Sequence, residues 1–161
     1  MEYHKILEKA RSKKKQIKQL LDKLQKLNTK EVDEYFHVEH EKVFKEIDCL
    51  KCANCCKTTG PLFTQKDIER ISQHLKIRPG EFIQQYLRID EDNDYVLQST
   101  PCVFLDKTNY CSIYSIKPKA CGEFPHTNRK NMKEISKLTF NNSLVCPAVS
   151  QMLENIEEKL K

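Results

Sequence analysis

The residues with the clearest capacity for chemistry are eight cysteines, four of them within eight positions. The eight are Cys49, Cys52, Cys55, Cys56, Cys102, Cys111, Cys121 and Cys146. A thiolate binds soft and borderline metals well, and two cysteines separated by two residues can direct both sulfurs to one ion. We therefore take all eight thiols as candidate metal ligands.

The spacing leaves two kinds of metal centre open. A C-x2-C-x2-C run, here Cys49, Cys52 and Cys55, is common in cubane iron–sulfur sites that take a fourth thiolate from elsewhere. A four-cysteine zinc site usually has two separate C-x2-C pairs, and no second pair is present in this sequence. The pattern favours an iron–sulfur cluster slightly over Zn²⁺.

The adjacent Cys55 and Cys56 are not expected to serve one ion equally well, because neighbouring side chains usually diverge. We expect Cys49, Cys52 and Cys55 to form half of one site and Cys56 to face a second site or none. Eight thiols would fill two four-sulfur sites. His126, five residues after Cys121, could replace one thiolate.

Clustered cysteines usually form disulfides in secreted proteins and bind metal in the cytosol, so the compartment decides how they are interpreted. The N-terminus lacks the apolar core of a secretory signal, and no apolar run approaches the roughly 20 residues of a membrane helix. We therefore expect a cytoplasmic protein that does not enter the membrane. Disulfides do not persist in that reducing compartment, so clustered cysteines more often bind metal there.

Apolar residues at spacings of three and four predict helices along most of the chain. One helix is expected over residues 2–27. Because Lys13-Lys14-Lys15 interrupts its apolar face, the half before these lysines is expected to project from the body of the protein. A second, capped by Asn28, is expected to reach about Ile47 and to pair with the first as an antiparallel hairpin.

Beyond the first cysteines, helices are expected in the ranges 64–75, 79–87 and 129–139 and after Cys146, with a small β-hairpin over 87–98. The predicted class is mainly α, or α+β with that hairpin, in a single domain organised around a cysteine-rich metal centre. We expect a helical hairpin over 1–47 and a metal-binding region over 48–161, with 28–47 packed against the latter.

The net charge of +5 is concentrated in residues 1–30, which hold ten Lys or Arg residues and three acidic ones. The basic helix over 2–27 could contact nucleic acid or another anionic surface. The segment lacks interleaved aromatic residues and a base-reading motif, so we favour a solvated helix face. A protein partner is a further alternative.

The cysteine pattern resembles the YkgJ-type cysteine-cluster family, described as a zinc- or iron-chelating domain with a CxxCxxCC signature. The resemblance extends from about Asp48 to Pro147 and includes Cys102, the stretch 111–125 and Cys146-Pro147. Members usually have Arg where this chain has Lys117. The resemblance implies metal chelation, and the family's biochemical role is largely unassigned.

Three functions follow as hypotheses. The first is an iron–sulfur protein with a redox or oxidoreductase-associated role, and the second is a zinc-stabilised interaction module without catalysis. The third is an enzyme that uses a metal-activated water or a free thiolate, with Glu123, His126 and Tyr114 near Cys121. No nucleophile–base–orienter set is recognisable, so we assign no catalytic residue and leave open whether the protein is an enzyme.

Overall fold

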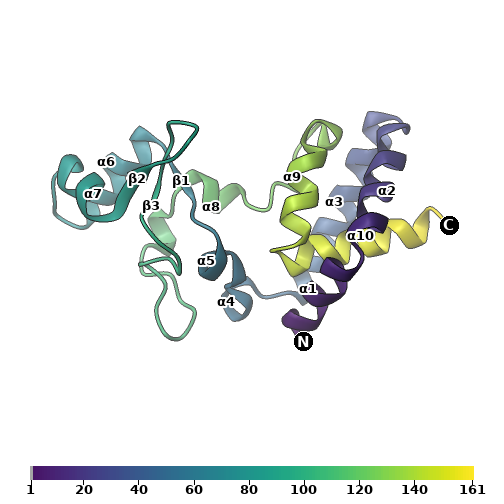
Figure 1. Ribbon diagram of the computed structural model, residues 1–161, viewed down its shortest axis with the longest axis horizontal. Helices are drawn as coiled ribbons and strands as arrows, with labels where there is room; N and C mark the ends of the chain where they lie inside the picture. Colours follow the sequence, from purple (N-terminus) through teal and green to yellow (C-terminus); the bar gives the residue numbers. More distant parts are fainter. Residues whose placement is uncertain (1) are drawn as a thin grey trace. The chain divides into compact units, whose positions relative to one another are not determined.

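The computed structural model describes residues 2–161 and folds them mainly into helices with one small antiparallel sheet (Figure 1). The predicted class, mainly α with a small β element, is confirmed. Contacts divide the chain into two units. The helical unit comprises the residues up to Cys52 together with Pro125–Lys161, and the sheet unit comprises Ala53–Phe124. The predicted division into 1–47 and 48–161 stays a prediction.

The helical unit contains six α-helices and one 3₁₀ helix among its described residues. They are α1 (Tyr3–Ser12), α2 (Lys14–Gln25), α3 (Thr29–Glu46), α4 (Cys49–Cys52), η2 (Met132–Ile135), α9 (Ser136–Ser143) and α10 (Pro147–Lys159). The predicted helices in 29–47 and after Cys146 are confirmed. The weak helical pattern over 129–139 corresponds to η2 and the first half of α9.

Helix α10 is the centre of the helical unit and packs against α1, α3 and α9 (Figure 1). Its inward face is apolar at a helical period, and Val149, Met152 and Ile156 are fully buried. Phe36 and Val43 bury the facing side of α3. The C-terminal helix α10 therefore holds the N-terminal helices together. The predicted hairpin of two N-terminal helices did not include α10, their principal packing partner.

The prediction of one continuous helix over residues 2–27 is wrong at Lys13. Helix α1 ends at Ser12 and α2 begins at Lys14, with Lys13 between them at φ −105° and ψ 19°. The break lets Leu7 and Ala10 of α1 become buried while α1 packs on α10. The expectation that this half projects from the body is wrong for the same reason.

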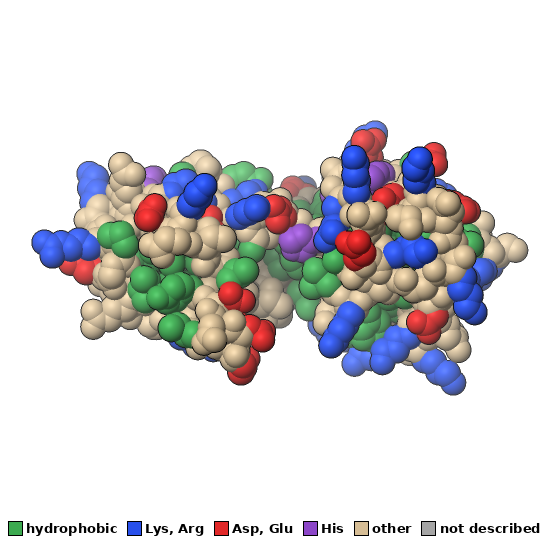
Figure 2. Space-filling view, turned by 90° about the horizontal axis from the view of Figure 1, so that it is seen from above, with side chains coloured by type: hydrophobic (Ala, Val, Ile, Leu, Met, Phe, Trp, Pro, Cys, Tyr) green, Lys and Arg blue, Asp and Glu red, His purple; other side chains and the backbone are tan. Residues whose placement is uncertain are grey.

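The lysines of α1 and α2 make several contacts within the helical unit. Lys9 pairs with Glu154, the Lys18 ammonium lies 5.0 Å from the centre of the Phe140 ring, and Lys23 Nζ donates to the Leu160 carbonyl. Acidic side chains lie among the Lys and Arg side chains on the face shown in Figure 2. A nucleic-acid contact through residues 2–27 stays a prediction. No helix within residues 2–161 combines the length and apolarity needed to cross a bilayer.

Helix α3 begins as predicted, because the Asn28 side chain accepts a hydrogen bond from the Lys30 N–H at 2.9 Å. Replacement of Asn28 by Ala is expected to lower the free energy of unfolding by about 1 kcal/mol, since it leaves one N-terminal donor without its cap. Chemical denaturation measures the change. Asn28→Asp keeps the acceptor and should stay close to wild type; an equal loss in both variants would contradict the capping role.

The sheet unit combines short helices with three strands. Its elements are α5 (Asn54–Thr58), β1 (Leu62–Phe63), α6 (Gln65–His74), α7 (Pro79–Tyr86), β2 (Leu87–Ile89), β3 (Tyr95–Leu97), η1 (Tyr114–Ile116) and α8 (Lys119–Glu123). The predicted helices in 64–75 and 79–87 and the hairpin in 87–98 are confirmed. Thr64 caps α6 through a capping box with Asp67, and Pro79 occupies the first turn of α7.

Strand β3 lies at the centre of the sheet, with β2 antiparallel on one side and β1 antiparallel on the other. The sequence predicted β2 and β3 but not β1, because two residues are too few to show an alternating pattern. Leu62 pairs with Val96 and Phe63 with Tyr95. Strand β1 thereby brings the chain that follows α5 onto the sheet.

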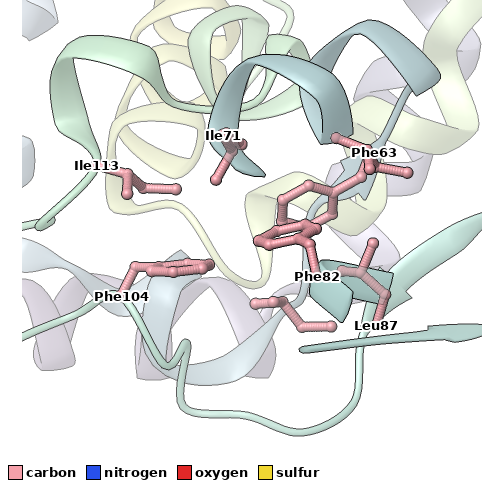
Figure 3. Close-up of a cluster of buried hydrophobic side chains, with 8 residues drawn as sticks. Phe63, Ile71, Phe82, Leu87, Phe104 and Ile113 are labelled. Carbon is pink, nitrogen blue, oxygen red and sulfur yellow. The ribbon is translucent and has the colours of Figure 1, made fainter. Parts of the chain in front are cut away.

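One apolar cluster underlies the sheet unit (Figure 3). Phe82 of α7 is fully buried, with its ring centre 5.9 Å from that of Phe63 and 6.3 Å from that of Phe104. Ile71 of α6 and Ile113 belong to the same cluster. The core therefore reaches the loop over 98–113, which carries Cys102 and Cys111 but has almost no regular structure of its own.

Candidate metal centre

Of the five cysteines in the sheet unit, four are carried by segments that its core and backbone hydrogen bonds bring together, and the fifth, Cys55, precedes Cys56 on α5. Cys56 lies on α5, Cys102 follows the sheet, Cys111 pairs as an isolated β-bridge with Leu105, and Cys121 lies on α8. We call these four residues the sheet-unit thiols. They come from four separate elements, so their sequence spacing alone could not group them.

Backbone hydrogen bonds link three of these segments directly. The Cys102 N–H donates to the Cys56 carbonyl at 2.7 Å, which ties the loop to α5. The Ser112 N–H donates to the Phe104 carbonyl at 2.8 Å and closes the loop that contains the Leu105–Cys111 bridge. Cys56, Cys102 and Cys111 are therefore held in one neighbourhood by main-chain geometry.

Electrostatic coupling indicates that the fourth thiol is near the other three. Burial raises the pKa of the Cys102, Cys111 and Cys121 thiols, and the charge on Cys56 raises all three further, that of Cys121 to about 12. A charge has this effect only on groups at short range. Burial and, to a lesser degree, mutual repulsion keep the pKa of these three thiols above its ordinary value, so they stay protonated unless a cation compensates their charge.

Cys56 behaves differently from its neighbours. A hydrogen bond from the Cys55 side chain lowers the pKa of Cys56 to about 7 against the opposing effect of burial, and the Lys57 charge adds to the lowering. Cys56 is thus partly ionised at neutral pH. The sequence analysis expected Cys56 to face a second site or none. In the structure its carbonyl accepts the Cys102 N–H, which associates it with the later cysteines.

A second group of thiols lies in the helical unit. Cys49 and Cys52 stand at the two ends of α4, and Cys146 directly precedes α10. Burial raises the pKa of Cys146 to about 11, and the charges of Cys49 and Cys52 contribute to the rise. We call Cys49, Cys52 and Cys146 the helical-unit thiols.

Neither group has the arrangement of a ready-made site. Within residues 2–161, no three His, Cys, Asp or Glu side chains are already placed to hold a metal ion together. The donor chemistry of the sheet-unit thiols nevertheless fits a thiophilic metal, because four sulfurs match the ligand number of zinc and of an iron–sulfur cluster. Rotation of neighbouring side chains would have to complete the coordination.

Comparison with known proteins identifies the family. A family model described as "CxxCxxCC: Putative zinc- or iron-chelating domain" matches residues 48–144. The chain belongs to the CxxCxxCC family. The match includes seven of the eight cysteines and ends two residues before Cys146.

A curated relative in Methanocaldococcus jannaschii, named Uncharacterized protein MJ0661, is 36% identical to this CxxCxxCC protein over 84 residues. The aligned part covers 49% of this chain and 44% of the relative. The chain therefore spans less than half the length of that protein. No solved structure matches the chain.

Of the three residues considered for catalysis, two lie in the sheet unit and one in the helical unit. Glu123 pairs with Lys119 at 3.7 Å on the exposed side of α8. Tyr114 is about half exposed and packs its ring beneath the Lys117 ammonium, 4.0 Å from the ring centre. His126 lies in the helical unit at a positive φ of 64°. These contacts are structural, and an enzymatic role gains no support from them.

Sequence reasoning missed two residues that hold the Cys111–Cys121 segment in place. Asp67 is 1% exposed and accepts a hydrogen bond from the Lys119 N–H at 3.1 Å. Arg70 donates to the Ile116 and Lys117 carbonyls. The cap formed by Thr64 and Asp67 was visible in the sequence, but no local pattern shows that the same carboxylate bonds to a residue 52 positions later.

Metal binding to the sheet-unit thiols is expected to release about three protons per ion at pH 8, because Cys102, Cys111 and Cys121 are protonated in the free protein. Zinc affinity should therefore rise with pH as protons compete less for sulfur. Titration calorimetry in buffers of different ionisation enthalpy counts the protons. Proton release near zero would show that these thiols are not the ligands.

Proposed function

We propose that this CxxCxxCC protein binds a metal through its cysteine thiolates, with an iron–sulfur cluster as the favoured centre and Zn²⁺ as the alternative. The observation that carries the proposal is the convergence of Cys56, Cys102, Cys111 and Cys121 within one unit. The preference for an iron–sulfur centre comes from the C-x2-C-x2-C run of Cys49, Cys52 and Cys55, which are not among these four thiols.

The protein residues would have two tasks at such a centre. The sheet-unit thiols would provide the ligands, and the aromatic cluster beneath their loops would exclude water from one side. A bound iron–sulfur cluster would supply one-electron transfer, with a potential set by burial and by nearby charge. Lys117 lies close enough to lower the pKa of Cys111 and Cys121 and would contribute positive charge there.

Anaerobic purification followed by elemental analysis and a visible spectrum tests the proposal. A brown protein with thiolate-to-iron absorption and matching iron and sulfide contents is the expected result. A colourless protein with stoichiometric zinc, even after attempted iron–sulfur reconstitution, would reject the iron–sulfur assignment. A protein that retains neither metal after both treatments would reject the proposal as a whole.

A zinc-stabilised interaction module is the second candidate, and the size of the sheet unit favours it. Ala53–Phe124 lies near the lower limit, roughly 70–80 residues, at which a hydrophobic core alone stabilises a fold. Zinc bound to the sheet-unit thiols would supply the missing folding energy. Under this alternative, chelation should abolish the cooperative thermal transition of the unit, and an unchanged transition would exclude it.

A further inference from the structure

The segment between Cys111 and Cys121 is attached to α6 by polar contacts that differ from ordinary core packing. Arg70 Nη2 donates to two successive carbonyls, those of Ile116 at 3.2 Å and Lys117 at 3.0 Å. Arg70 Nε also faces the Ile116 carbonyl, at 3.4 Å. One guanidinium thus holds two successive carbonyls, including the one that directly precedes Pro118 and α8.

Asp67 completes this attachment from a buried position. Its Oδ1 accepts hydrogen bonds from Arg70 Nη2 at 2.8 Å and from the Lys119 N–H at 3.1 Å. Its Oδ2 accepts from the Thr64 N–H at 2.9 Å. One carboxylate therefore joins the start of α6, the guanidinium and the start of α8.

The anchoring helix is itself fixed in the core. Ile68 and Ile71 of α6 are fully buried, and Ile71 lies in the same cluster as Ile113, two residues after Cys111 (Figure 3). The Arg70 and Asp67 contacts therefore fix the chain midway between two thiols relative to a rigid reference. The segment has only the three-residue η1 and the five-residue α8 as regular structure, so it has little rigidity of its own.

We propose that Arg70, supported by Asp67, is a positioning residue for the metal: it sets the spacing of Cys111 and Cys121 so that both sulfurs can bind one ion. This inference rests on the proposed function. It follows because a metal site requires its ligands within fractions of an ångström of the coordination geometry, and outer contacts orient those ligands. Substitution of a residue that orients a ligand typically lowers metal affinity by about 10- to 100-fold.

The test measures zinc affinity by chelator competition and records the absorption spectrum with Co²⁺, whose bands report the number and geometry of bound thiolates. Arg70→Gln removes the guanidinium contacts, whereas Arg70→Lys keeps the charge and one donor. Thr64→Ala removes the hydroxyl that accepts from the Asp67 N–H but keeps the Thr64 N–H that donates to the Asp67 carboxylate. Arg88→Gln removes an exposed charge from β2. Thermal unfolding of each metal-free variant measures its stability.

Arg70→Gln is expected to weaken zinc binding about 10- to 100-fold and to alter the Co²⁺ bands, while Thr64→Ala and Arg88→Gln stay within about threefold of wild type with unchanged bands. Arg70→Lys should bind zinc more tightly than Arg70→Gln and more weakly than wild type. If Arg70→Gln does not fold, the zinc affinity of Arg70→Lys relative to wild type tests the inference.

Two results would overturn the inference. One is an Arg70 variant with wild-type zinc affinity and Co²⁺ bands. The other is an equal loss of affinity in Thr64→Ala and Arg70→Gln with both spectra unchanged, since that would indicate a general effect on folding. Wild-type protein that shows neither thiolate–cobalt absorption nor an iron–sulfur spectrum after reconstitution would instead reject the proposed function itself, and this inference with it.

Discussion

Replacement of Cys121 by Ser is expected to weaken zinc binding by the sheet unit about a hundredfold. Structural zinc sites with four ligands bind with about 10–16 kcal/mol, so the loss of one thiolate should cost on the order of 3 kcal/mol. Cys121 is a stringent test because it is the sheet-unit thiol farthest along the sequence from Cys56. Burial, together with the charges of Cys56, Cys102 and Cys111, raises its pKa to about 12.

Cys146→Ser is the matched control for this prediction. It makes the same chemical change at another buried thiol whose pKa is also raised, but in the helical unit. Elemental analysis and chelator competition on both variants should show that only Cys121→Ser loses the metal of the sheet unit. Equal metal content and affinity in Cys121→Ser and wild type would remove Cys121 from the ligand set.

Much of the fold could be predicted because its signals are local. The capping residues Asn28 and Thr64, and Pro79 in the first turn of α7, mark where three helices begin. The end of α1 at Lys13 was not predicted, because residues 2–27 contain no Pro or Gly, and Lys13-Lys14-Lys15 interrupts the apolar pattern without requiring a helix to end there. Helix α1, which precedes the break, packs against α10, whose sequence lies more than 130 positions away, so this contact leaves no local signal.

The candidate site was predictable in its chemistry but not in its grouping. Residue type and density indicated the thiols as candidate metal ligands, since eight cysteines in a chain of 161 residues are unusual. Their grouping depends on the hydrogen bond between Cys102 and Cys56 and on the Leu105–Cys111 bridge, both of which are long-range or irregular. The spacing rule joined Cys55 to Cys49 and Cys52, and it contains no information on which thiols the core brings near Cys56.

A buried ion pair in the helical unit leads to the second large prediction. Glu39 of α3 is fully buried, and its Oε1 lies 2.6 Å from Lys159 Nζ at the end of α10. Asn155 Nδ2 donates to its Oε2 at 2.6 Å. Burial opposes the charge on Glu39, but the Lys159 and Asn155 contacts outweigh it and hold the pKa of this carboxyl below 4.5. The pair thus fixes α10 to α3 by charge as well as by apolar packing.

Lys159→Met is expected to lower the free energy of unfolding at pH 7 by about 3 kcal/mol, because it leaves a buried carboxylate without its cation. We take the lower end of the range for a broken buried pair, since the Lys159 side chain is 42% exposed and water screens the charge. Lys9→Met is the matched control. It breaks the more exposed ion pair between Lys9 of α1 and Glu154 of α10. It should lower the free energy of unfolding by less than about 1 kcal/mol.

The pH dependence identifies the buried charge as the cause. In wild type, a carboxyl with a lowered pKa stabilises the fold above pH 4.5, and this contribution is lost as the pH falls through its folded pKa. In Lys159→Met the same carboxyl should have a raised pKa, so the loss of stability relative to wild type should be largest near neutral pH and shrink as acid protonates Glu39.

Denaturation from pH 4 to 8 of the two single variants and the double variant E39Q/K159M measures this pH dependence. The double variant should recover most of the loss at pH 7. A deficit that is independent of pH and persists in the double variant would mean that Lys159 acts through the packing of its alkyl chain and not through its charge.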